Sequence, residues 1–206
     1  MGNYQGLKKE ETRSEYGKDI HYTSWPVGKI PKELQRPELD QLTELGYDWD
    51  DPRDVVDMFE KKVAKFAGSK YACTVDCCSN GLFLAMKYLD VKGTITIPKR
   101  TYVSPPMQII HAGCELKFED REWSGVYKLE PYNIWDGATR WTKGMYVGNE
   151  AIQVVSFQLK KRVPIGRGGM ILTDSKDAFE WFKYMSYDGR NLQSVSCPKH
   201  IYPPYL

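Results

Sequence analysis

Long apolar runs are missing from this sequence, and so is an excess of charge of either sign. No stretch approaches the roughly 18 to 20 apolar residues that a membrane-spanning helix needs, and residues 1–10 contain no apolar signal region. With 29 Lys and Arg against 27 Asp and Glu, the formal net charge is only +2. We therefore expect a cytoplasmic protein that binds neither a membrane nor nucleic acid.

The sequence lacks a metal-binding pattern of cysteines. The five cysteines are an odd number, and no second paired cluster is present to complete a zinc site. We therefore expect no metal, and we expect buried thiols instead of disulfides in a chain that has no export signal. A length of 206 residues suits one domain with a single core.

The chain divides into a polar lead-in and a domain in which strands and helices alternate. Residues 1–24 are polar and rich in charge, and Pro26 and Pro31 stiffen the segment that follows, so residues 1–50 predict an extended N-terminal arm and lead-in. From residue 51 to residue 206 we expect one α/β domain, whose first helix begins at Asp51 and Pro52 and ends at Gly68. Strands are predicted at 71–75, 94–98, 115–118 and 151–155, and helices follow the first two of them. This alternation predicts a mostly parallel sheet with helices on both faces.

Polar side chains follow several of the predicted strands. Ser79 lies in a turn of small residues before a helix, Tyr102 follows the strand at 94–98, and Asp136 ends an apolar run. Ligands of parallel sheets bind beyond the carboxyl ends of the strands, which is where these residues fall. Two structural alternatives stay open at this point, because Ser79 also suits a helix N-cap and Asp136 also suits a turn.

A serine and two lysines occupy the connection between two predicted core strands, at 151–155 and 168–173. The connection begins at Ser156, carries Lys160 and Lys161, and ends in Gly168 and Gly169. A lysine that is buried on a loop of a rigid scaffold loses its charge more easily, and the neutral amine is the nucleophile that a Schiff base requires. The alternative interpretation is a solvated basic loop.

In their order along the chain, these segments resemble the DegT/StrS family of pyridoxal phosphate (PLP)-dependent aminotransferases. The resemblance covers about residues 50–190. It implies the large domain of PLP-dependent transferase fold type I, with PLP as cofactor, an amino acid such as glutamate as donor and a keto-sugar nucleotide as acceptor. The matching segments are Phe59-Glu60, Cys77-Cys78-Ser79-Asn80-Gly81-Leu82, Thr101-Tyr102, Asp136-Gly137-Ala138, Ser156-Phe157 and Gly166-Arg167-Gly168-Gly169.

The resemblance assigns a role to each candidate residue. Lys161 matches the lysine that forms the Schiff base, with Lys160 as the alternative in a shifted register, and Asp136 matches the carboxylate that pairs with the pyridine nitrogen. Tyr102 matches the aromatic residue that stacks on the cofactor ring. The phosphate-binding positions are matched by Cys78, Ser79 and Ser156.

Several departures from the family pattern accompany these matches. Thr139 stands where the family has Gln or His, and the turn Cys77-Cys78-Ser79 replaces Ser-Gly-Thr. Only 15 residues separate Asp120 from Asp136, where the family has a further strand and helix, so we expect one such unit to be deleted. Relatives also continue beyond the position of Leu206 into a C-terminal region, so the resemblance implies a truncated form.

The resemblance also bears on partners and leaves a second function open. It implies a homodimer, and the tail at Tyr205 and Leu206 is a candidate to pack across its interface. The alternative is a PLP-binding or degenerate aminotransferase-like subunit with a regulatory or assembly role. A dehydratase of the same family is disfavoured, because those relatives carry histidine where this chain has Lys161.

Overall fold

The computed structural model describes residues 40–48, 52–187 and 189, and its contacts divide the chain into two units at Asp57 and Met58. The predicted N-terminal arm up to residue 39, the Asp51 cap, Cys197 and the tail at Tyr205 and Leu206 lie outside the described residues. The first unit contains helix α1 (Asp40–Glu44) and the start of helix α2 (Pro52–Ala67). Gly46, at φ +97°, follows α1 in a left-handed conformation that glycine adopts readily.

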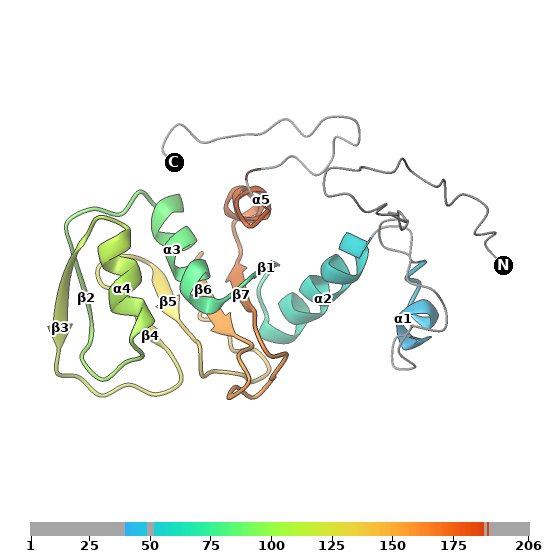
Figure 1. Ribbon diagram of the computed structural model, residues 1–206, viewed down its shortest axis with the longest axis horizontal. Coiled ribbons are helices and arrows are strands. Elements are labelled where there is room, and N and C mark those ends of the chain that lie inside the picture. Colours follow the sequence, from blue (N-terminus) through green and yellow to red (C-terminus); the bar gives the residue numbers. More distant parts are fainter. Residues whose placement is uncertain (1–39, 49–51, 188, 190–206) are drawn as a thin grey trace, which may run out of the picture. The chain divides into compact units, whose positions relative to one another are not determined.

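The second unit contains the remaining helices and all strands of the described residues (Figure 1). None of the described helices has the length and apolarity needed to cross a bilayer, and no His, Cys, Asp and Glu side chains in the same residues are grouped to hold a metal. In chain order the elements are β1 (Tyr71–Val75), α3 (Cys78–Tyr88), β2 (Thr94–Pro98), α4 (Ser104–His111), β3 (Glu115–Glu119), β4 (Tyr127–Lys128), β5 (Ile134–Asp136), β6 (Ile152–Ser156), β7 (Gly169–Thr173) and α5 (Lys176–Met185).

The sheet is mixed, whereas the sequence predicted a mostly parallel one. Five strands pair in the order β1-β7-β6-β5-β4, and β2 pairs with β3 in a parallel ladder. Strand β7 is antiparallel to both β1 and β6, and β5 is parallel to β6, so β1, β5 and β6 all run in one direction. The reversals have a local cause: β6 and β7 are joined by residues 157–168, which contain no crossover helix, so the chain turns back on itself.

Helices cover both faces of this sheet, as predicted. Side chains of α2 pack on one face, where Val63, Ala64 and Ala67 meet Val155 and Met170. On the opposite face α3 and α5 cover Cys73, Val154 and Ile171, with Leu82 of α3 and Phe182 of α5 fully buried. Successive side chains of β6 and β7 therefore point to opposite faces of the sheet, and both faces are buried.

The segment between β3 and β5, where the resemblance predicts a deletion, is short. Among the described residues this segment holds no helix, and its only strand is the two-residue β4, antiparallel to β5. Beyond β4, Glu130 exchanges two backbone hydrogen bonds with Thr96 of β2, at 2.9 and 3.0 Å. The short segment therefore bridges the space between β5 and β2, so that Tyr127 and Leu129 are buried in the core.

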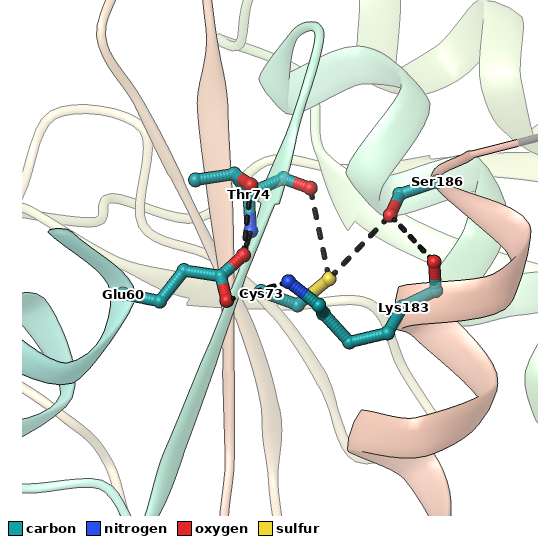
Figure 2. Close-up of polar contacts among 5 residues, drawn as sticks. All are labelled: Glu60, Cys73, Thr74, Lys183 and Ser186. Atoms are coloured by element: carbon teal, nitrogen blue, oxygen red, sulfur yellow. Dashed lines mark hydrogen bonds and ion pairs between the residues drawn. The ribbon is translucent and has the colours of Figure 1, made fainter. Parts of the chain in front are cut away.

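A buried ion pair joins α2 to α5 across the outer strand β1 (Figure 2). Glu60 is 4% exposed; its Oε1 accepts hydrogen bonds from the backbone N–H and the hydroxyl of Thr74, at 2.7 and 2.8 Å. Its other oxygen accepts from Lys183 Nζ at 2.9 Å. On the α5 side, Ser186 Oγ lies 3.7 Å from Cys73 Sγ. The Glu60 carboxylate thus satisfies an outward-pointing N–H of β1 and links helices from opposite faces of the sheet.

Replacing Glu60 by alanine is expected to lower the free energy of unfolding by about 2 kcal/mol, because the Thr74 N–H loses its acceptor in a buried place. Urea denaturation followed by circular dichroism measures the change. The control is Glu180→Ala, which breaks an exposed pair with Lys176 and should cost less than about 0.5 kcal/mol. Equal losses for the two variants would contradict the importance of the buried pair.

Candidate functional site

The carboxyl ends of β1, β5 and β6 lie at the same edge of the sheet, because these strands share one direction. Three predicted site segments therefore come together there: the turn after β1 with Cys78, the end of β5 with Asp136, and the end of β6 with Ser156. Strand β7 starts at this edge, where Gly169 pairs with Ser156. The edge predicted from the alternation of strands and helices is thus the one that gathers the candidate residues.

Gly169 allows the start of β7 to press against the first residues of α3. A Cβ atom at this position would lie 2.7 Å from the backbone nitrogen of Cys78 and 2.8 Å from the backbone carbonyl carbon of Cys77. Both neighbours are backbone atoms, so any side chain would push the helix N-terminus away from the loop. The preceding Gly168 bridges to Cys77 and has φ +129°, a conformation that disfavours other residues.

Asp136 is a buried carboxylate with a donor on each oxygen. It is 5% exposed; Oδ2 accepts from the Tyr127 hydroxyl at 2.7 Å, and Oδ1 accepts from the Ala138 N–H at 2.9 Å. The second bond confirms the turn-capping interpretation, but it engages only one oxygen. Burial raises the pKa of Asp136, and the two hydrogen bonds and the charge of Lys161 oppose that rise.

Lys161, and not Lys160, is the lysine whose charge reaches the site. Lys161 is half-buried and Lys160 is exposed, in a tight turn where the Lys161 N–H donates to the Gln158 carbonyl at 2.8 Å. The charge of Lys161 lowers the pKa of both Asp136 and Cys78. This geometry favours Lys161 over Lys160 as the candidate lysine. Lys160 is exposed, as expected for a solvated basic loop, whereas Lys161 is not.

The N-cap of α3 is Cys77, so the interpretation of Ser79 as N-cap is wrong. The Asn80 N–H donates to Cys77 Sγ at 3.4 Å, and the Ser79 hydroxyl donates to Ser104 Oγ at 2.7 Å, toward α4. Cys78 is buried, and burial followed by the charge of Asp136 raises its pKa, so its thiol stays protonated. Within the described residues, Cys73, Cys77, Cys78 and Cys114 form no disulfide.

The two other candidates differ in exposure. Ser156 is half-buried, and its Oγ accepts from the Gln158 N–H at 3.4 Å, so it faces the start of the lysine loop. Tyr102 lies between β2 and α4 with 73% of its surface exposed. The structure thus places Cys78, Asp136 and Lys161 within one electrostatic cluster. The role of Tyr102 stays a prediction.

Sequence reasoning missed Tyr127 and gave no role to Thr101. The Tyr127 hydroxyl contacts Asp136 and lies 2.7 Å from Thr101 Oγ1. Burial raises the pKa of Tyr127 above its ordinary value, so it stays a hydrogen-bond donor. The link depends on the pairing of Tyr127 with Asp136 across β4 and β5, and the available signal was the unusual shortness of this segment.

The donor set suits a ligand with a cationic ring nitrogen at one end and an anionic group at the other. Asp136 supplies a buried carboxylate whose oxygens each keep a lone pair. The backbone N–H groups at the start of α3, beside Ser79 and Ser156, suit an anion. Lys161 supplies an amine whose charge lowers the pKa of Asp136 at the first end and of Cys78 at the second.

Comparison with known proteins confirms the family resemblance. The family model described as the DegT/DnrJ/EryC1/StrS aminotransferase family matches residues 48–145. The match includes Cys78, Ser79, Tyr102 and Asp136 and ends before Ser156 and Lys161. A curated relative, the spore coat polysaccharide biosynthesis protein SpsC of Bacillus subtilis (strain 168), is 26% identical over 82% of this chain and 54% of its own length.

Solved structures share the fold. DesI, analysed in the presence of its TDP-sugar product, superposes with a TM-score of 0.59 at 18% identity, over 77% of this chain and 52% of its own. NtdA from Bacillus subtilis with bound cofactor PMP superposes with a TM-score of 0.57 at 13% identity, over 82% of this chain and 51% of its own. The chain therefore spans about half the length of these relatives.

Removing the charge of Asp136 is expected to stabilise the protein at neutral pH. The folded pKa of Asp136 lies above its ordinary value, so the folded state binds more protons than the unfolded state and stability falls as the pH rises between the two pKa values. Asp136→Asn abolishes this loss and keeps an acceptor for Ala138. Urea denaturation from about pH 3 to about pH 7, a range that begins below the pKa of an unperturbed Asp, should therefore show the variant gaining on the wild type as pH rises. A constant difference would contradict the raised pKa.

Proposed function

We propose that this chain is a member of the DegT/DnrJ/EryC1/StrS aminotransferase family and holds PLP in a fold type I large domain. The observation that carries the proposal is the juxtaposition of a buried carboxylate, Asp136, and a half-buried lysine, Lys161, at the carboxyl edge of the sheet. The family model over residues 48–145 and the fold shared with PMP-bound NtdA support it independently.

The described residues fit the cofactor at three places. Asp136 would pair with the ring nitrogen and hold a proton there, because an ionised carboxylate favours the protonated ring. The N-terminus of α3, with Cys78 and Ser79, and the hydroxyl of Ser156 would bind the phosphate. The exposed ring of Tyr102 would stack on the cofactor.

Lys161 would hold the cofactor covalently through Nζ. When bound, PLP supplies an electron sink that stabilises negative charge on the amino-bearing carbon of a substrate. Once the substrate amine has replaced Lys161 on the cofactor, the freed Lys161 amine would take a proton from that carbon and return it, a role that needs a neutral amine. The other residues orient the ring and keep its charge distribution fixed.

The substrates that we propose are an amino acid donor, with glutamate as the first choice, and a keto-sugar nucleotide acceptor. DesI, whose structure contains a TDP-sugar product, and the polysaccharide biosynthesis protein SpsC support this substrate class. A second candidate function is a PLP-binding subunit with a regulatory or assembly role. One observation favours it: α4 and the residue before it present Val103, Met107 and Ile110 to solvent, at 61%, 48% and 59% exposure.

The first experiment locates the covalent attachment. Purified protein is incubated with PLP, reduced with borohydride and mapped by peptide mass spectrometry. We expect the adduct on Lys161 and its loss in Lys161→Ala, because Lys161 is the lysine whose charge reaches Asp136. Lys160→Ala, the neighbouring exposed lysine, is the matched control and should label as the wild type does. An adduct on Lys160, or none on the wild type, would overturn the assignment. Loss of the absorbance of bound cofactor on adding glutamate separates the enzyme from the non-catalytic subunit.

We also propose a homodimer whose interface includes the apolar residues Val103, Met107 and Ile110. Ile110→Glu places a charge in that surface and should convert a dimer to a monomer in multi-angle light scattering at micromolar concentration. Lys62→Glu changes an exposed residue of α2 and should leave the dimer intact. A monomeric wild type, or a dimer that survives Ile110→Glu, would contradict this interface.

A further inference from the structure

The carboxylate of Asp136 has one donor that the backbone fixes and one that a side chain supplies. The Ala138 N–H is given by the turn after β5, whereas the 2.7 Å bond to Oδ2 comes from Tyr127. The rotation of the Asp136 carboxylate about its Cβ–Cγ bond therefore depends on where the Tyr127 hydroxyl is held. Tyr127 is therefore the partner of Asp136 that a side-chain substitution can remove.

Tyr127 is itself fixed from three directions. Its backbone pairs with Asp136 across β4 and β5, and its side chain is 4% exposed. The ring of Trp123 contacts the Tyr127 ring edge-on, with centroids 4.8 Å apart, and Trp123 Nε1 donates to the Arg100 carbonyl at 2.8 Å. The Tyr127 hydroxyl also lies 2.7 Å from Thr101 Oγ1. Few rotations are left to the phenol under these restraints.

The hydrogen-bond direction in this network follows from the inventory of protons. Tyr127 has one hydroxyl proton and gives it to Asp136, which as a carboxylate can only accept. Thr101 must then donate to the Tyr127 oxygen. Each bond polarises the next, so the relay from Thr101 through Tyr127 to Asp136 strengthens the final bond beyond that of an isolated phenol.

We propose that Tyr127 is a positioning residue for the cofactor site: its hydroxyl, held by Thr101, orients the Asp136 carboxylate toward the ring nitrogen and keeps it ionised. This inference rests on the proposed function. It assigns a role to the short segment between β3 and β5, in which β4 brings Tyr127 against the acid.

The charges around Asp136 agree with this role. Burial favours the protonated acid, and the groups that face Asp136 are Tyr127 from β4, Lys161 from the β6–β7 loop and Cys78 from α3. Tyr127 and Lys161 lower the pKa of Asp136, and the neutral thiol of Cys78 contributes no charge. Tyr127 is thus needed to oppose the effect of burial before any ligand arrives.

The test compares three hydroxyl deletions. Tyr127→Phe removes the donor to Asp136 and keeps the ring, and Thr101→Val removes the donor to Tyr127 with little change in shape. Tyr146→Phe is the matched control, because its hydroxyl donates to the Ala151 carbonyl at 2.8 Å and has no part in the relay. Should Tyr127→Phe fold poorly, Thr101→Val still tests the relay.

Two readouts are measured on each variant. In cofactor-free protein, carboxyl carbon NMR should show the pKa of Asp136 rising in Tyr127→Phe, rising less in Thr101→Val and staying constant in Tyr146→Phe. With PLP, borohydride should still trap the adduct on Lys161 in all three variants. The maximal single-turnover rate with glutamate should fall about tenfold in Tyr127→Phe, the size expected for one hydrogen bond. The glutamate concentration that gives half of this rate should change little.

The outcomes separate this proposal from the proposed function. If the wild type takes up no PLP at Lys161, the proposed function fails and the inference falls with it. If the wild type takes up PLP and reacts, but Tyr127→Phe matches it in both the Asp136 titration and the rate, only the role of Tyr127 is overturned. A slower rate without a shifted Asp136 titration would also overturn it, because the effect would then not act through Asp136.

Discussion

The burial of one negative charge is the constraint on which the arrangement of the site depends. Asp136 is 5% exposed at the end of β5, and taking a carboxylate out of water costs free energy unless donors and cations surround it. The neighbouring segments provide these partners: β4 supplies the Tyr127 hydroxyl, the turn after β5 supplies the Ala138 N–H, and the loop after β6 supplies the charge of Lys161. Because burial raises the pKa of Asp136, the ionised acid lowers the stability of the fold at neutral pH.

Close backbone contact, in contrast, holds the lysine loop against the first turn of α3. Gly169 lies where a Cβ atom would meet Cys78 N at 2.7 Å, and its strand β7 is the one that reverses direction between β1 and β6. The reversed strand returns the loop to the edge of the sheet where β1 and β5 end. The mixed topology and the position of Lys161 therefore have the same origin, namely a connection from β6 to β7 without a crossover helix.

The sequence was sufficient to predict the local helices and strands, because these depend on hydrophobic periodicity. It also predicted the edge of the sheet at which the candidate residues lie, because that edge depends on strand direction. Helix α2, strand β1 and the edge that carries Asp136 and Lys161 followed from such patterns. The bond from Tyr127 to Asp136 did not, because it depends on an antiparallel register between two very short strands. The same holds for the pair of Glu60 with Lys183, which lie 123 residues apart in sequence and meet only in the fold. The Cys77 cap of α3 was missed because sulfur is an uncommon acceptor at that position.

The carboxylate of Glu60 has a consequence for how copies of this chain can meet. An outer strand with unpaired N–H groups is a template for a strand of another molecule, and proteins commonly protect such strands with charge. On β1 the N–H of Thr74 is already taken by Glu60, and Lys183 reaches the same carboxylate from α5. A foreign strand would therefore have to displace a buried ion pair before it could use this N–H of β1.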